Sequence, residues 1–213
     1  MSKSEIQVWK ARLDLEPPRI TRLSQLLSEE ERRRAGRFYF PRDCRRFTAA
    51  RSVLRLILAQ YLELAPARVE FADGASGKPF LPGKTLRFNV SHSAEIALVA
   101  VADGREIGVD VERVRPQPDM HRIAERVFSA REIAELQGAP PEAQTEVFFR
   151  RWTQTEARLK AIGVGLGGAR HLAQDHWPVC PVNPEVGYVG AVAVEAGDIE
   201  LAIQEFSFGA FPD

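Results

Sequence analysis

Apolar residues recur along this chain at two spacings, which separate expected strands from expected helices. Alternating or continuous apolar runs predict strands over residues 6–13, 86–90, 96–102 and 107–112. The run over 96–102 is continuously apolar, as in a strand buried on both faces. Near the end of the chain, residues 188–194 and 199–206 predict a hairpin with its turn at 196–198.

Helices are predicted where apolar residues lie three or four positions apart and suitable caps precede them. Ser28 with Glu31, and Ser129 with Glu132, have the spacing of capping boxes, in which each pair satisfies free backbone amides. Two longer helices are expected as well. The predicted helices follow Ser28, begin near Pro41, follow Ser129, and run from Pro141 to a glycine at 163.

The order of these elements is strand, helices and strands, and the same order then repeats. This order indicates an α+β fold built as a pseudo-dimer of two similar halves. We place the halves at residues 1–105 and 106–213, the second carrying all the acidic candidates described below. The duplication is inferred from element order, since the two halves share no clear sequence repeat.

Composition limits the classes of function. The 213 residues are 45% hydrophobic and 27% charged, and no apolar run approaches the roughly 20 residues of a membrane span. The formal net charge of zero gives no support for general attraction to nucleic acid or membranes. A polar N-terminus without a visible signal peptide, and two widely separated cysteines, favour a cytoplasmic protein with free thiols.

The most informative stretch is the strand at 107–112, because it places two carboxylates one residue apart on one face. Asp110 and Glu112 share this face with Gly108, which leaves room for a bulky neighbour. Two carboxylates that close repel each other unless a cation lies between them, and Mg²⁺ is the natural hard cation for oxygen ligands. A surface strand with acids on its solvated face would give the same pattern.

The long second helix supplies a further acid and a cation. Trp152, Glu156 and Lys160 are each four residues apart and share one stripe of the helix. A carboxylate and an ammonium one turn apart can serve a metal and a phosphate together. The alternative is an ordinary Glu–Lys pair on a helix surface, worth roughly 0.2–0.5 kcal/mol.

Other candidates are polar or basic residues near the first strands. Ser91 and His92 follow the strand at 86–90, where functional loops often lie; they bind an anion or simply close the strand. They are expected on opposite faces, so they are badly placed as a nucleophile pair. Lys78 follows a glycine in a stiff loop, and Arg34 and Arg51 lie around the first helices, where a guanidinium suits phosphate. Taken alone, all three fit ordinary surface residues at least as well.

In order and combination these segments resemble the 4′-phosphopantetheinyl transferases of the Sfp type. The resemblance is carried by residues 28–34, 77–79, 88–93, 107–112 and 148–166, of which the last two are the most specific. It implies a pseudo-dimer of two similar α+β halves with the active site in the cleft between them. It also implies transfer of the 4′-phosphopantetheine arm of coenzyme A to a serine of an acyl or peptidyl carrier protein, with release of adenosine 3′,5′-bisphosphate.

The resemblance also implies a role for each candidate. Asp110, Glu112 and Glu156 match Mg²⁺ ligands, and Glu156 is expected to act as base for the carrier serine, directly or through water. Lys160 is expected to contact the phosphate under attack. The residues that match the coenzyme A site are Arg34, Arg51, Lys78, Ser91, His92 and Lys160.

One position departs from the family pattern, in which a lysine precedes the glutamate of the long helix. Thr155 stands there, about 100° around the helix from Glu156. The departure bears on efficiency or choice of carrier more than on reaction type. We expect a monomeric, Mg²⁺-dependent transferase. The alternatives are a metal-dependent hydrolase of a nucleotide pyrophosphate and a non-catalytic module that binds coenzyme A or a carrier protein.

Overall fold

The computed structural model describes residues 5–74, 76–165, 177–195 and 200–205. The element order confirms the α+β prediction, with strand, helices and strands occurring twice. In chain order the elements are β1 (Glu5–Arg12), α1 (Pro17–Ser24), α2 (Glu29–Ala35), α3 (Pro41–Leu62), η1 (Pro66–Arg68), β2 (Ala72–Asp73), β3 (Pro79–Phe80), β4 (Leu86–Ser93), β5 (Ile96–Asp103), β6 (Ile107–Arg113), α4 (Met120–Val127), α5 (Ala130–Gly138), α6 (Pro141–Ile162), β7 (Val179–Val182), β8 (Tyr188–Val194) and β9 (Glu200–Glu205).

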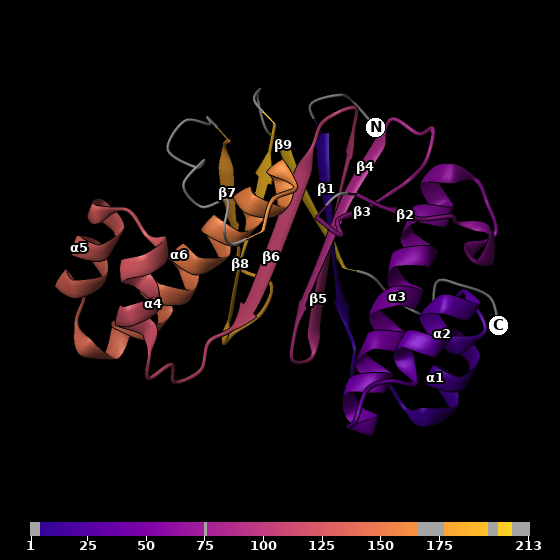
Figure 1. Ribbon diagram of the computed structural model, residues 1–213, viewed down its shortest axis with the longest axis horizontal. Coiled ribbons are helices and arrows are strands. Elements are labelled where there is room, and N and C mark those ends of the chain that lie inside the picture. Colours follow the sequence, from indigo (N-terminus) through magenta and orange to yellow (C-terminus); the bar gives the residue numbers. More distant parts are fainter. Residues whose placement is uncertain (1–4, 75, 166–176, 196–199, 206–213) are drawn as a thin grey trace.

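Two main sheets stand between two groups of helices (Figure 1). The first sheet has the order β4-β5-β1-β9 and the second the order β6-β8-β7, while β2 and β3 form a separate small ribbon. Helices α1–α3 lie beside the first sheet and α4–α6 beside the second. Apolar side chains of β1, β5, β6 and β8 form one shared cluster, so the two sheets are held together by a common core.

Strands β4 and β6 belong to different sheets, yet side chains of β4 reach the strand edge of β6. Asn89 accepts a hydrogen bond from the Val109 amide at 2.9 Å, and Ser93 accepts one from the Arg113 amide at 3.2 Å. Because buried amides need partners, these side chains do for β6 what a neighbouring strand would otherwise do. We call this contact, formed by Asn89, Ser91 and Ser93 of β4 with residues 109–113 of β6, the seam.

The alternation predicted for β6 is confirmed, but the reason for Gly108 differs from the expected one. Ile107, Val109 and Val111 enter the shared core. On the other face, a Cβ at Gly108 would lie 2.1 Å from the carbonyl oxygen of Ala157 and 2.3 Å from the amide nitrogen of Ala161. The glycine therefore makes room for the backbone of α6 rather than for a ligand.

Several boundaries also differ from the sequence-based expectation. Residues 91–93 continue β4 instead of following its end, because their backbone pairs with β5 as far as Ser93. The predicted terminal hairpin is wrong: β8 is already flanked by β6 and β7, so β9 pairs in parallel with β1. The expected turn at 196–198 lies outside the described residues. The elements α1, α4 and β7, of eight, eight and four residues, were not predicted, because they are too short to show a clear periodic pattern.

Within the described ranges, none of the helices combines the length and apolar character needed to cross a membrane. The division of the chain at residue 105 stays a prediction. The pairing of β9 with β1 shows that the last described strand returns to the sheet of the first half.

Replacement Gly108→Ala should lower the free energy of unfolding by at least about 2 kcal/mol, because the methyl group overlaps helix backbone that cannot yield locally. Urea unfolding followed by circular dichroism measures this change. The control is Gly138→Ala, whose Cβ meets nothing within 4 Å and which should change stability by no more than about 1 kcal/mol. Equal unfolding midpoints for the two variants would contradict the packing described here.

Candidate functional site

The structure brings Asp110, Ser91 and Lys160 into one hydrogen-bonded group at the seam. Asp110 Oδ1 accepts from Lys160 Nζ at 2.6 Å and from Ser91 Oγ at 2.8 Å. Lys160 Nζ also donates to Ser91 Oγ at 3.1 Å. The Asp110 side chain is only 6% exposed, whereas that of Lys160 is 29% exposed. A buried carboxylate is thus held beside an ammonium whose other side faces solvent.

The second carboxylate oxygen of Asp110 is the feature that points to a ligand. Asp110 Oδ2 is buried and has no hydrogen-bond partner among the described residues. Leaving an acceptor of an ionised carboxylate buried without a partner costs on the order of 1–3 kcal/mol or more. A cation at Oδ2 would remove that cost, so this atom fits a metal ligand.

The other two acids, Glu112 and Glu156, have contacts different from those of Asp110, although Glu156 interacts electrostatically with both of the others. Glu112 accepts from Ser93 Oγ at 2.7 Å and pairs with Arg115 at 3.4 Å. Burial raises the pKa of Glu156; the charges of Asp110 and Glu112 raise it further, while Lys160 lowers it. The three carboxylates therefore share one electrostatic environment, in which placing a third negative charge is unfavourable.

As the side chains lie, no three His, Cys, Asp or Glu groups within the described part of the chain come close enough to hold a metal ion. Asp110 is fixed by its partners, but Glu112 and Glu156 are half-buried and have long side chains. The donor set consists of hard oxygen atoms, which fits Mg²⁺. Joint coordination requires new rotamers of the glutamates.

Arg34, Arg51 and His92 line a separate cavity of about 640 Å³ on the α3 side of β4. The volume lies within the range of ordinary ligand pockets. The cavity also carries four carboxylates, those of Glu30, Glu31, Glu70 and Asp73. The cavity therefore carries both positive and negative side chains. Its ability to bind an anion depends on which cations are not already paired with a carboxylate.

Glu31 forms ion pairs with two of the arginines that line this cavity. It accepts from Arg51 Nε at 2.8 Å and from Arg55 Nε at 2.7 Å, and it also completes the confirmed capping box with Ser28. Burial opposes its ionisation, but the hydrogen bond from Arg55 and the charge of Arg51 outweigh burial and lower its pKa. Arg34, in contrast, contacts the Phe47 ring and has no carboxylate partner among the described residues. It is the cation most available to an anion.

His92 lies on the face of β4 opposite to Ser91, as the alternation predicted. Ser91 points to Asp110, and His92 lines the cavity with Val90. Desolvation lowers the pKa of His92, and the charges of Lys160 and Arg46 lower it further. The ring nevertheless remains exposed toward the cavity, where solvent screens these effects.

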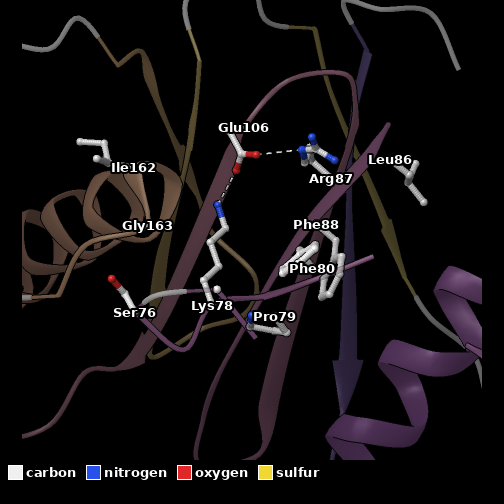
Figure 2. A pocket seen from close by; sticks show the side chains of 11 residues that line it. Ser76, Lys78, Pro79, Phe80, Leu86, Arg87, Phe88, Glu106, Ile162 and Gly163 are labelled. Atoms are coloured by element: carbon white, nitrogen blue, oxygen red, sulfur yellow. Dashed lines mark hydrogen bonds and ion pairs between the residues drawn. The ribbon is translucent and has the colours of Figure 1, made fainter. Parts of the chain in front are cut away.

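Lys78 is not with the arginines. Its Nζ donates to Glu106 at 2.8 Å and to the carbonyl oxygen of Ala161 at 3.1 Å. Figure 2 shows it pointing to Glu106, which also accepts from Arg87 Nε at 2.8 Å. Lys78 therefore lines a second cavity, of about 270 Å³, and supports the last turn of α6.

Sequence reasoning found the acids, Lys160 and Ser91 but missed other residues that fix the acidic strand. Asn89 and Ser93 flank Ser91 at the strand period, a signal that was available once 91–93 are taken as strand. Glu31 was read only as a helix cap, and its pairing with Arg51 and Arg55 depends on tertiary contact. Thr155, the departure from the family pattern, is 3% exposed and lies in the interior.

The family models of known proteins match both halves of the chain. Residues 106–196 match the model described as 4′-phosphopantetheinyl transferase superfamily, and residues 15–103 match the model described as 4′-phosphopantetheinyl transferase, N-terminal. Together these ranges contain every candidate discussed above.

Individual proteins are similar over most of the chain. The 4′-phosphopantetheinyl transferase HetI of Nostoc sp. is 38% identical over 89% of this chain and 87% of its own length. The 4′-phosphopantetheinyl transferase of Bacillus subtilis is 34% identical over 68% of this chain and 64% of its own. The L-aminoadipate-semialdehyde dehydrogenase-phosphopantetheinyl transferase of Xenopus laevis is 30% identical over 78% of this chain and 58% of its own. With the likeness to the Nostoc protein extending over nearly all of both chains, this chain belongs to the 4′-phosphopantetheinyl transferase superfamily.

Proposed function

We propose that this chain is an Sfp-type transferase that moves the 4′-phosphopantetheine arm of coenzyme A to a serine of an acyl or peptidyl carrier protein. The serine oxygen forms a bond to the phosphorus that carries the arm, and the phosphoanhydride bond to the nucleotide breaks. Adenosine 3′,5′-bisphosphate leaves. The observation that carries the proposal is the buried, unpartnered Oδ2 of Asp110 beside Lys160 and near Glu156, in a chain of this superfamily.

Asp110, Glu112 and Glu156 would hold Mg²⁺ in this proposal. Asp110 supports it best, since one oxygen is fixed by Lys160 and Ser91 and the other is free. When bound, the ion would neutralise charge on the pyrophosphate and on the leaving group. The site draws on both halves of one chain, so the proposed enzyme acts as a monomer.

Glu156 and Lys160 would act on the reacting groups. The raised pKa of Glu156 brings this carboxylate closer to the range in which it accepts a proton from the carrier serine. The ammonium of Lys160 is anchored on Asp110 and partly exposed, so it can donate to a phosphate oxygen as negative charge develops there. These two residues lie one helical turn apart on α6, so both can reach one proposed reaction centre.

Coenzyme A would place its nucleotide phosphates at the cavity of Arg34, Arg51 and His92. Arg34 is the strongest candidate for the 3′-phosphate, because Arg51 is already paired with Glu31. Ser91 and Lys78 stay predictions as coenzyme ligands. Ser91 could contact the coenzyme only next to Lys160, with which it shares a hydrogen bond. Lys78 would first have to break its ion pair with Glu106.

The compartment proposed is the cytoplasm, where free thiols persist. Cys44 and Cys180 are both free in the structure, in keeping with this proposal. The carrier is identified here only by class, as a folded protein with an exposed serine and an acidic surface.

The wild-type chain should add the mass of the phosphopantetheine arm to an apo carrier protein in the presence of coenzyme A and Mg²⁺. Asp110→Ala should reduce this loading by about 100-fold or more, since a metal ligand and the partner of Lys160 are both lost. Intact-protein mass spectrometry over a panel of apo carrier proteins measures loading. Asp119→Asn, at an exposed position before α4, is the control and should load normally.

Normal loading by Asp110→Ala would show that the acidic site is assigned wrongly. Consumption of coenzyme A by the wild type without any mass added to a carrier would instead favour the hydrolase. Binding without either reaction would favour the non-catalytic module.

Glu156→Gln should stabilise the Mg²⁺-free protein at neutral pH. The folded-state pKa of Glu156 is raised above 4.5, so its ionisation opposes folding once the pH exceeds that value. The advantage of the variant should therefore be present at pH 7 and vanish below pH 4.5. Thermal unfolding in EDTA across this range tests the sign. Added Mg²⁺ should raise the Tm of the wild type more than that of the variant, and the opposite order would argue against Glu156 as a ligand.

Arg34→Ala should raise the KM for coenzyme A about tenfold while changing the KM for 3′-dephospho-coenzyme A much less, because the lost partner is the 3′-phosphate. Steady-state loading with both substrates measures the ratio. Arg37→Ala is the matched control, because Arg37 shares the adjoining cavity with Arg34 but does not line the cavity of His92. Equal effects of Arg34→Ala on both substrates would remove the 3′-phosphate assignment.

A further inference from the structure

The two-residue turn between β4 and β5 lies directly after the strand that carries Ser91, His92 and Ser93. The backbone register pairs Ser93 with Ile96, so Ala94 and Glu95 alone form the turn. Ala94 has φ of 48°, in the left-handed region that alanine seldom occupies. A conformation of this kind persists only where surrounding contacts hold it.

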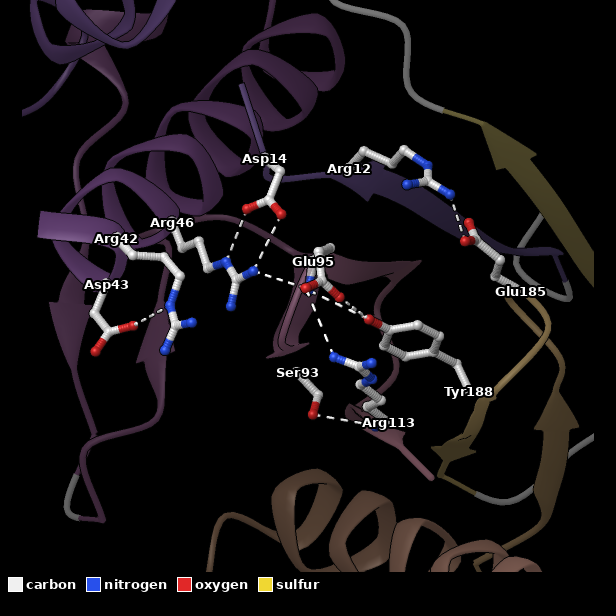
Figure 3. A network of polar contacts seen from close by, with 10 residues as sticks. All are labelled: Arg12, Asp14, Arg42, Asp43, Arg46, Ser93, Glu95, Arg113, Glu185 and Tyr188. Atoms are coloured by element: carbon white, nitrogen blue, oxygen red, sulfur yellow. Dashed lines mark hydrogen bonds and ion pairs between the residues drawn. The ribbon is translucent and has the colours of Figure 1, made fainter. Parts of the chain in front are cut away.

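Glu95 supplies such contacts to several elements at once (Figure 3). Its carboxylate accepts from Arg46 of α3 at 2.8 Å and from the hydroxyl of Tyr188 of β8, and it pairs with Arg113 of β6 at 3.8 Å. Its backbone carbonyl accepts from the Leu13 amide at 2.8 Å. One side chain therefore ties the turn to both halves of the molecule.

Arg46 is itself held from the other side. It donates to both carboxylate oxygens of Asp14, at 2.9 Å from Nε and 3.1 Å from Nη2. Its side chain is 15% exposed, so this pairing with Asp14 and Glu95 is more sheltered than a surface ion pair. The turn is anchored on a rigid group rather than on a free side chain.

The position of this anchor matters because the turn lies next to the last side-chain contact of the seam, while Ala94 and Ile96 pack into the shared core. Ser93, next to the turn, accepts from the Arg113 amide at 3.2 Å and donates to Glu112 at 2.7 Å. β4 and β6 lie in different sheets, so no backbone ladder fixes their relative position. Displacement of the turn would carry Ser93 away from Glu112.

We propose that Glu95 is a positioning residue that holds the β4–β5 turn against β6 and thereby keeps Ser93 in hydrogen-bond contact with Glu112 and the Arg113 amide. Because Glu112 accepts from Ser93, the same contact would orient Glu112 as a ligand of Mg²⁺, and this part of the inference rests on the proposed function. The part that concerns the relative position of the strands does not.

The test compares Glu95→Gln with Glu185→Gln in the full-length protein. Glu185 pairs with Arg12 and also links the two halves, and its side chain is 30% exposed against 28% for Glu95. Glu95→Gln keeps an acceptor for Tyr188 but loses the charge that pairs with Arg46 and Arg113. Amide hydrogen exchange resolved at Arg113 and Val109, together with the Mg²⁺ concentration at half-maximal Tm shift, gives two independent measurements.

In Glu95→Gln, exchange at the Arg113 amide should accelerate about tenfold or more, with a smaller change at Val109, which bonds to Asn89 farther along the seam. The half-maximal Mg²⁺ concentration should rise several-fold, and Glu185→Gln should leave both measurements unchanged. Unaltered exchange at Arg113, or equal acceleration in both variants and throughout the sheets, would overturn the inference. If exchange accelerates locally but the half-maximal Mg²⁺ concentration does not change, the part of the inference that concerns Glu112 as a metal ligand is overturned.

If the wild type neither loads a carrier protein nor responds to Mg²⁺, the proposed function fails. Exchange at Arg113 still decides whether Glu95 positions the seam, because that measurement requires neither coenzyme A nor metal.

Discussion

The close approach of α6 to β6 at Gly108 is the contact on which the rest of the site depends. A Cβ there would overlap the Ala157 carbonyl and the Ala161 amide, so the helix lies directly on the strand backbone. Small residues on both sides, Ala157 and Ala161 against Ala191 and Ala193, continue the same close packing. At this separation Lys160 reaches Asp110 at 2.6 Å, which a thicker interface would prevent. The geometry of the charged site therefore depends on the small residues that let α6 approach the sheet closely.

Burial then determines what the charged groups can do. Asp110 is nearly enclosed and keeps one oxygen without a partner among the described residues, while Lys160 and Glu156 remain partly open. The fixed carboxylate of Asp110, the more accessible carboxylate of Glu156 and the accessible ammonium of Lys160 are the groups that the proposed function requires for a cation and a phosphate. The pKa of Glu156 is raised first by burial and then by the charges of Asp110 and Glu112, so part of the shift comes from holding the three acids together. The same proximity that disfavours the ionised glutamate in the free protein favours a cation among the acids.

Sequence reasoning recovered the elements whose signals are local. The capping boxes at Ser28 and Ser129, and the helix from Pro141 to a left-handed glycine at 163, are confirmed because each depends on neighbouring residues. The path of β9 could not be inferred, since its choice between β8 and β1 depends on which strand edge is free. The reason for Gly108 was missed for a related cause: the alternation reveals which face a residue occupies, but not what packs against that face.

The two faces of β4 explain how one short segment serves two regions without mixing them. Ser91 and Ser93 point to β6 and fix the acidic strand, whereas His92 between them points to the cavity of Arg34 and Arg51. Since the period of a strand alternates sides, a ligand that spans both regions must pass around the strand edge rather than through it. The end of that edge is the turn at Ala94 and Glu95, where Arg46 joins α3 to the seam. Besides desolvation and Lys160, the charge of Arg46 lowers the pKa of His92. The residue that anchors the turn therefore also affects a side chain of the cavity. A change at this turn should therefore affect Ser93 on one face of β4 and His92 on the other, although these two side chains point in opposite directions.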